Sequence, residues 1–313
     1  MNNIKKTLKN SNLGTVIALI VLMIFVTILN PSFIRSNNLL NLLRQLTING
    51  FIAYGMTFVI LTGGIDLSVG SILGLTSAIF VGLAAKGMPM FISLIIALIL
   101  GSILGLINGI FITKAKLAPF IVTLATMTIY RGLTLVYTNG RPIPGNRESR
   151  LFAFLGRGLV LNIPFQVILF FIVFIILYIL LKKTAFGRKV YAVGGNEKAS
   201  FIAGIKTDKV KIAIYTISGL MASIAGLILT SRLNSAGPQA GASYEMDAIA
   251  AVVLGGTSMT GGKGSLTGTL IGALILGVLN NGLNLLGVSS FYQQIVKGAV
   301  ILLAVLVDRK RNK

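Results

Sequence analysis

The sequence contains no cysteine, no histidine and no tryptophan, and only seven of its 313 residues are acidic. Without cysteine there are no disulfides or thiol nucleophiles, and without histidine the commonest zinc ligand and general base are missing. Any carboxylate site must come from Asp66, Glu148, Glu197, Asp208, Glu245, Asp247 and Asp308. No two of these are paired at helical spacing within an apolar run, so we expect no catalytic residues, no bound metal and no cofactor on this chain.

Charged residues are scarce as well, at 11% against about 25% in soluble domains. Hydrophobic residues make up 55%, and the mean hydropathy is +0.90, so lipid must cover much of the surface. The net charge is +21, but the basic residues lie mostly between apolar runs. That distribution is typical of topology signals, because Lys and Arg are retained in the cytoplasm. We therefore expect membrane lipid, and no nucleic acid, as a partner.

Ten stretches are candidates for membrane-spanning helices, which need about 17–25 residues. Leu117–Thr138 contains Arg131, and Asp247–Thr257 is short and leads into a glycine-rich turn. Leu46–Thr62 and Leu67–Ala85 flank a glycine break, and six stretches are clear: Gly14–Leu29, Pro89–Thr113, Pro164–Leu181, Ile212–Ser231, Leu266–Leu286 and Phe291–Val307. The first of these lacks the small-residue exit of a cleavable signal peptide, so we interpret it as a span. The sequence predicts an all-α polytopic membrane bundle with about ten transmembrane helices, although eight would also fit.

Three basic clusters orient the chain: the N-terminus, residues 182–211 and the C-terminus. The positive-inside rule places all three in the cytoplasm, which six spans before the loop and four after it satisfy. We therefore predict a single membrane-spanning domain over residues 1–313, with a cytoplasmic loop over 182–211. One outer segment departs from the rule, because Asn139–Asn162 contains Arg141, Arg147, Arg150 and Arg157. Either the span count is wrong nearby, or this surface docks an acidic partner.

The loop over 182–211 predicts a short helix from Asn196 to Gly204. Asn196 can cap its start and Gly204 can end it. Exposed apolar residues on such a helix have two explanations: it lies on anionic lipid, or it docks a soluble cytoplasmic subunit. Its few large apolar groups favour docking, and the candidate contact residues are Gly195, Asn196, Glu197, Ala199, Ala203 and Gly204.

Three further patterns are ambiguous. Gly255–Ser265 is rich in glycine but lacks the Walker spacing, so it predicts a tight turn and no nucleotide site. Asp66 is either a functional intramembrane acid, or Asp66 or Ser68 caps the helix that begins near Leu67, at the membrane interface; capping is favoured. Val59–Gly64 echoes Val252–Thr257, which leaves an internal repeat open. Polar residues within apolar spans either join helices or line a sugar pathway: Asn49, Tyr54, Asn108, Asn280 and Asn284.

Four long motifs resemble those of one family. They are Met56–Ser71, Gly187–Ala199, Tyr244–Thr257 and Leu279–Ser289. They are similar to the membrane permease subunits of bacterial ABC sugar importers, in the branch that serves ribose and related monosaccharides. The likeness extends from about Asn30 to Lys310.

The resemblance implies a transport subunit in the bacterial cell membrane rather than an enzyme. It implies three kinds of partner: a second copy of the permease, a cytoplasmic ATP-binding subunit and an extracytoplasmic sugar-binding protein. D-ribose is the expected sugar, Asn196–Gly204 the expected coupling helix, and Arg141–Arg157 the expected seat of the binding protein. The alternative is a sugar transporter driven by an ion gradient, for which Asp66 is the one candidate intramembrane acid.

Overall fold

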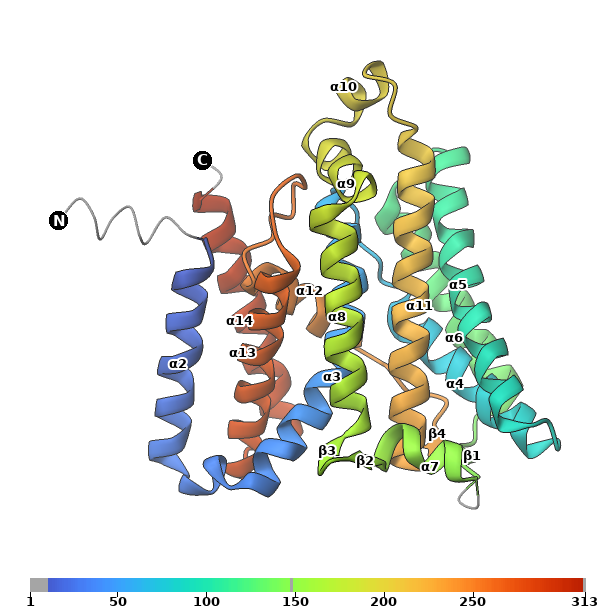
Figure 1. Ribbon diagram of the computed structural model, residues 1–313, viewed down its shortest axis with the longest axis vertical. Helices are drawn as coiled ribbons and strands as arrows, with labels where there is room; N and C mark the ends of the chain where they lie inside the picture. The colour runs from blue at the N-terminus through green and yellow to red at the C-terminus, as the bar shows by residue number, and fades with distance from the viewer. Residues whose placement is uncertain (1–10, 147–148, 312–313) are drawn as a thin grey trace.

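A computed structural model describes residues 11–146 and 149–311. The chain is an all-α bundle of long helices (Figure 1). The first half contains α2 (Ser11–Leu29), η1 (Pro31–Ile34), α3 (Ser36–Leu61), α4 (Val69–Ala85), α5 (Met90–Lys114) and α6 (Pro119–Thr138). The second half contains α7 (Arg150–Arg157), α8 (Phe165–Lys183), α9 (Ala185–Gly195), α10 (Glu197–Ile202), α11 (Thr207–Leu233), α12 (Tyr244–Leu254), α13 (Leu266–Leu285) and α14 (Ser290–Arg311).

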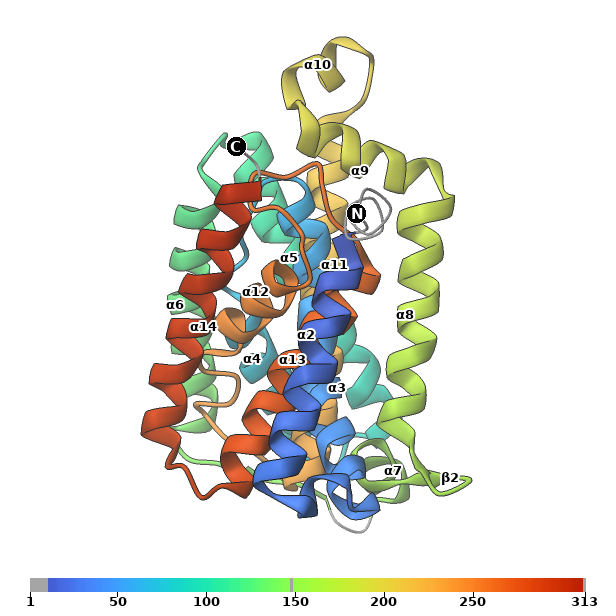
Figure 2. The same cartoon turned by 90° about the vertical axis from the view of Figure 1, so that its left-hand side faces the viewer.

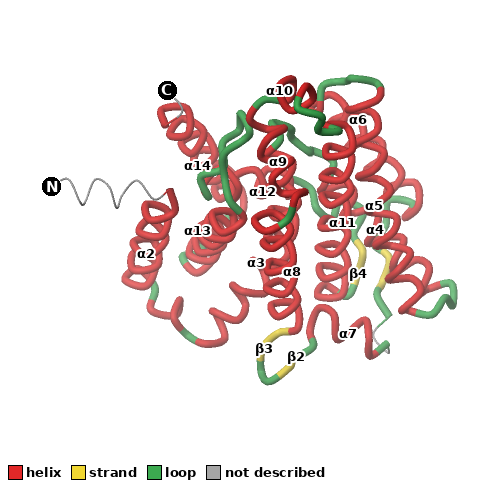
Figure 3. The backbone as a smooth tube through the Cα atoms, turned by 45° about the horizontal axis from the view of Figure 1, so that its top comes forward, coloured by secondary structure: helices red, strands yellow, loops and turns green. Residues whose placement is uncertain are grey.

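Four two-residue strands lie near one end of the bundle (Figure 3). Strand β1 (Ile143–Pro144) pairs antiparallel with β4 (Ser235–Ala236), and β2 (Leu159–Val160) pairs with β3 (Ile163–Pro164). The first pair joins segments far apart in the sequence. It thereby ties the loop after α6 to the end of α11.

Each of the ten predicted spans coincides with a helix of the structure. Within the described residues, five helices are long and apolar enough to cross a membrane by themselves: α5, α6, α8, α11 and α13. Leu13–Leu29 of α2 and Val69–Ala85, which is α4, are apolar but shorter. Large apolar side chains face outward: Ile28 is 75% exposed and Val136 is 76% exposed. Such faces are stable only in contact with lipid or another apolar surface, so the chain is a polytopic membrane protein.

Helices α4 and α12 start inside the bundle rather than at its ends (Figures 1 and 2). An 11-residue helix such as α12 is about 16 Å long, roughly half of the hydrocarbon core. A non-helical segment precedes each of these two helices, residues 62–68 before α4 and 237–243 before α12. We call α4 and α12 half-helices because both start inside the bundle, although α4, with 17 residues, is the longer. The two meet where Gly70 at the start of α4 touches Gly241 before α12, and a Cβ atom on either glycine would collide with the other's carbonyl oxygen.

The halves of the bundle run in opposite directions (Figure 1). Helix α2 descends and α8 ascends, and the pairs α3 with α11, α4 with α12, α5 with α13 and α6 with α14 are likewise opposed. Opposed directions are the arrangement that an inverted repeat requires, and the echo found in the sequence does not follow this arrangement. The echo pairs the end of α3 with the end of α12, whereas the structural counterpart of α3 is α11.

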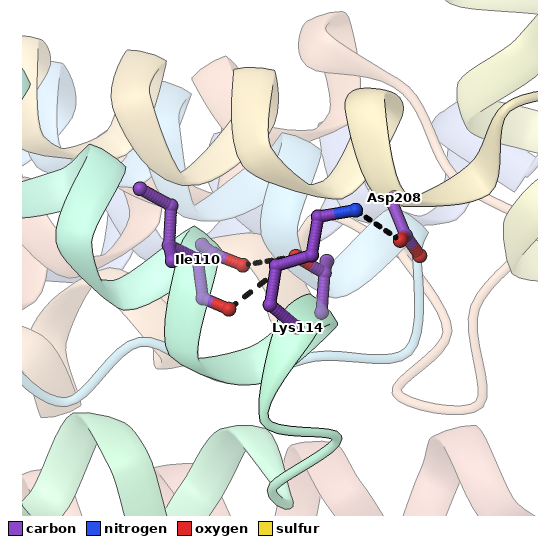
Figure 4. A network of polar contacts seen from close by, with 5 residues as sticks. Ile110, Lys114 and Asp208 are labelled. Carbon is purple, nitrogen blue, oxygen red and sulfur yellow. Dashed lines mark hydrogen bonds and ion pairs between the residues drawn. The ribbon is translucent and has the colours of Figure 1, made fainter.

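Helix α5 packs against α11 through three glycines, Gly101, Gly105 and Gly109, spaced four residues apart. A Cβ atom on Gly105 would collide with the carbonyl oxygen of Tyr215 in α11. Small residues at this spacing let two membrane helices approach backbone to backbone. At one end of the pair, Lys114 Nζ lies 3.1 Å from Asp208 Oδ2, an ion pair between α5 and α11 (Figure 4).

The two ends of the bundle differ. The start of α2, the end of α14 and helices α9 and α10 lie at one end, and α7 with the short strands lies at the other (Figures 1 and 2). The predicted loop over 182–211 is therefore mostly helical, and α9 is an element that the sequence analysis missed. Helix α9 continues through Gly194 and Gly195 and ends at Asn196, whose backbone N–H donates to Ala192 O.

Candidate functional site

A buried carboxylate organises the start of α4. Asp66 Oδ1 accepts hydrogen bonds from Ser68 N at 3.0 Å and Ser68 Oγ at 2.6 Å, and Oδ2 accepts one from Ser218 Oγ at 2.8 Å. The Asn108 amide donates to Ser68 Oγ at 2.8 Å. Asp66 therefore stabilises the turn before α4, whereas the N-cap position of α4 is Ser68, whose side chain makes no capping hydrogen bond. The predicted location was wrong: Asp66 is fully buried among α4, α5 and α11 rather than at the membrane interface.

Arg131 on α6 holds the two half-helices together. Its Nη1 donates to the carbonyl oxygens of Pro238 at 2.9 Å and Ala240 at 2.8 Å, and its Nη2 donates to that of Gly70 at 3.3 Å. Carbonyl groups of extended backbone at membrane depth have no water to satisfy them. A single guanidinium thus supplies donors to both the α4 side and the α12 side of the junction.

Three of the predicted pathway residues lie together. Asn49, Asn280 and Asn284 line a cavity of about 360 Å³ among α3, α11, α12, α13 and α14. The other polar side chains on its wall include Asp247, Gln293 and Lys297, and the apolar ones include Leu46, Ala251 and Leu276. The volume falls in the range of sites for small molecules.

The sequence analysis missed the charged pair in this cavity. Lys297 Nζ lies 3.0 Å from Asp247 Oδ2, and Asn49 Nδ2 donates to the same oxygen at 3.2 Å. The Asp247 side chain is 10% exposed and the Lys297 side chain 27%. Such an ion pair at membrane depth costs desolvation and is commonly functional. A carboxylate in the first turn of α12 also suits the positive end of the helix dipole.

The other two predicted pathway residues lie elsewhere. Tyr54 is fully buried and stacks on Phe170, with ring centroids 4.7 Å apart. Asn108 belongs to the hydrogen-bond network of Asp66. The helical positions of both residues face neighbouring helices, so neither lines the cavity.

At the opposite end, the predicted short helix is present as α10. Asn196 caps it, because its Oδ1 accepts a hydrogen bond from Ala199 N at 2.9 Å. Phe201 is 70% exposed and Ile202 is 85% exposed, so nothing in the described part of the chain covers this apolar surface. Gly195, Glu197, Ala199, Ala203 and Gly204 are exposed as well.

Contacts tie this end to the rest of the bundle. The Glu197 carboxylate lies 2.6 Å from Lys211 Nζ on α11. Tyr191 of α9 donates to the carbonyl oxygen of Gly264 at 2.9 Å, and burial raises the pKa of this phenol. Gly262 N donates to Leu61 O at 2.9 Å, which joins the turn over 255–265 to the end of α3. That segment is a turn between helices, as the sequence predicted.

The basic outer segment lies at the end away from α10. Arg141, Arg150 and Arg157 are exposed there, and Arg147 lies outside the described residues. Gly145 N donates to Asn234 O at 2.9 Å, and the Ser231 hydroxyl donates to the carbonyl of Phe152, so α11 supports the segment. Over the described part of the chain, acidic side chains do not gather into a group that could hold a metal ion.

Comparisons with known proteins place these features in context. A family model described as "Branched-chain amino acid transport system / permease component" matches residues 38–305. The ribose import permease protein of Bacillus subtilis (strain 168) is 61% identical over 300 residues, 96% of this chain and 93% of the relative. The ribose import permease protein of Escherichia coli (strain K12) is 52% identical over 95% of this chain and 94% of the relative. The xylose transport system permease protein of that strain is 37% identical over 96% of this chain and 93% of the relative. No solved structure matches the chain significantly.

Proposed function

The chain belongs to the permease family of bacterial ABC importers, and we propose that it forms the membrane pathway of an ATP-driven importer of D-ribose. It is a transport subunit, not an enzyme, and the family implies an ATP-binding subunit and a substrate-binding protein as partners. The observation that carries the choice of sugar is the 61% identity to a ribose import permease over nearly the whole chain.

A second copy of the chain completes the pathway in this proposal, and lipid surrounds the two copies. In each copy, the cavity containing Asn49, Asn280 and Asn284 lies along the route of the sugar. The whole chain, residues 1–313, acts as one membrane-spanning domain. Its basic clusters favour cytoplasmic termini and a cytoplasmic loop over 182–211. The chain itself then needs no cofactor.

Exposure is the feature that suits α10 to docking the ATP-binding subunit. Phe201 and Ile202 are apolar and uncovered, and a partner cleft would remove them from water. Glu197 links α10 to α11 through Lys211, and α11 also bears Ser218, the partner of Asp66. A push on α10 would therefore reach the start of α4 through one rigid helix. At the other end, exposed Arg141, Arg150 and Arg157, with Arg147, suit an acidic surface of the binding protein.

Replacing Glu197 with lysine tests the coupling role. The change repels Lys211 and removes a favourable acid from the first turn of α10. We expect the protein to insert and to assemble with its ATP-binding subunit, while ribose uptake per ATP hydrolysed falls about tenfold, the scale of a coupling of 1–3 kcal/mol. Gly195→Pro is expected to act in the same direction. Uptake and ATP hydrolysis are measured together in proteoliposomes.

The control for both variants is Lys209→Ala, an exposed change in the same loop. Normal uptake by Glu197→Lys and Gly195→Pro would refute the coupling role of α10. The energy source is tested separately with the wild type. Uptake that continues after collapse of the ion gradient, but stops without ATP, supports the importer; the reverse result supports the ion-driven alternative.

A further inference from the structure

We infer that the cavity lined by Asn49, Asp247, Asn280 and Lys297 is a specific binding site for a neutral polyhydroxyl molecule of pentose size. The inference rests on the proposed transport function and deepens it. The permease itself would then recognise the sugar by its hydroxyl groups, rather than leave all recognition to the binding protein. Asp247 is the anchoring acceptor.

The hydrogen bonds of Asp247 leave one of its carboxylate oxygens available to a ligand. Within the described residues, the two side-chain contacts of Asp247, from Lys297 and from Asn49, both use Oδ2. Oδ1 is left available on a carboxylate that is almost enclosed. A hydroxyl group that donates to a charged acceptor makes a stronger bond than one that donates to a neutral acceptor. Asp247 can therefore accept a hydrogen bond from a ligand without giving up its ion pair.

The cavity wall also contains Asn280, whose side-chain oxygen is an acceptor without a partner in the described part of the chain. Asn280 Oδ1 is buried and receives no hydrogen bond within the described part of the chain. Buried polar atoms in proteins are normally paired, and those that are not require a specific reason. Asn284, one turn along the same face of α13, accepts from Gln293 Nε2 at 2.8 Å and keeps its own amide hydrogens as donors. The wall thus offers both acceptors and donors, which is what a hydroxyl group needs.

The ion pair between Asp247 and Lys297 distinguishes a neutral polyol from an amino acid as the ligand. An amino acid has an ammonium and a carboxylate, and each needs a counter-charge. Asp247 and Lys297 are already 3.0 Å apart and neutralise each other, so an amino acid would have to break that pair. A neutral polyol would not, and the apolar wall at Leu46, Ala251 and Leu276 suits the C–H face of a sugar ring. Arg232 also lines the cavity, which makes a sugar phosphate the anionic alternative to be tested.

The experiment measures direct binding in the absence of the binding protein. The permease is assembled with its ATP-binding subunit in lipid nanodiscs, and saturation-transfer NMR is recorded with D-ribose, D-ribose 5-phosphate and L-leucine. We expect a saturable signal with D-ribose only. Asp247→Asn, which keeps the shape but loses the charge, is expected to weaken it about tenfold, and Asn280→Leu by a similar factor.

The control is Ser102→Ala, because Ser102 bonds only within its own helix and lies in a different groove. Lys297→Arg, which keeps the charge on the partner of Asp247, is expected to retain binding. Should Asp247→Asn fail to assemble, Asn280→Leu decides the matter.

The outcomes separate the two claims. Ribose uptake by the wild type without a ribose signal, or equal signals from wild type, Asp247→Asn and Asn280→Leu, would overturn the site and leave the importer intact. Preferential binding of L-leucine or the sugar phosphate would overturn the polyol class. Absence of ribose uptake by the wild-type transporter would instead refute the proposed function.

Discussion

We expect the substitution Arg131→Met to abolish uptake and to lower the midpoint of thermal unfolding substantially. Methionine fits the volume but leaves the carbonyl oxygens of Pro238 and Ala240 without their donor, and it removes the second donor to Gly70 O in the first turn of α4. A buried polar group that loses its partner costs about 1–3 kcal/mol, so two together exceed the effect of an ordinary substitution. The two half-helices would no longer be held at a fixed separation.

The midpoint is measured on detergent-solubilised protein by size-exclusion chromatography after heating, and uptake is measured in cells. Arg131→Lys is an informative second variant, because an ammonium group has donors but not the planar fork that reaches both segments. We expect it to recover part of the stability. Arg35→Met, at an exposed position, is the control. Wild-type stability and uptake in Arg131→Met would show that the contacts of Arg131 with both half-helices have no structural importance.

The second large effect is expected from Gly105→Val. The first added carbon atom would collide with the Tyr215 backbone, and neither α5 nor α11 can move without separating Gly101 and Gly109 from the same partner helix. Overpacking at a flexible side chain costs about 1–3 kcal/mol, and a collision with backbone costs more. We expect little folded protein in the membrane, measured as the monodisperse fraction after solubilisation.

Gly132→Val provides a matched control for that substitution. Gly132 lies in the apolar helix α6, but a Cβ atom there would meet open space. We expect its stability to stay within about 0.5 kcal/mol of the wild type, as for most surface changes. Equal yields of the two variants would contradict the close packing of α5 on α11.

Most of the helices could be predicted from the sequence because lipid imposes a simple condition on them. A long apolar run must form a helix to satisfy its backbone, so the ranges follow from composition. Asp247–Thr257 was expected to be short, and α12 is. The half-helices themselves could not be predicted, because they depend on Arg131 reaching across from another element. The echo between Val59–Gly64 and Val252–Thr257 lies in glycine-rich stretches at the ends of α3 and α12, which the opposed directions of the two halves do not pair.

The site was predictable where the interaction is local. The Asn196 cap spans three residues, so it follows from a short pattern. The Asp247–Lys297 pair spans 50 residues, and no local pattern indicates it. The spacing of Gly101, Gly105 and Gly109 was visible in the sequence and would have indicated the packing of α5. Tyr54 was assigned to the pathway by residue type alone, whereas its orientation depends on the position of Phe170.

The segment before α4 cannot complete its hydrogen bonding until later helices have been inserted. Ile65 O, before α4, accepts from Thr123 Oγ1 at 3.2 Å, and Gly70 O accepts from Arg131; both donors lie on α6. Asp66 also requires Ser218, which is synthesised much later. The centre of the molecule therefore closes only after α11 has entered the bilayer. A chain truncated before α11 would leave a carboxylate in the membrane without its full set of partners, so biosynthesis of this fold is cooperative across its two halves.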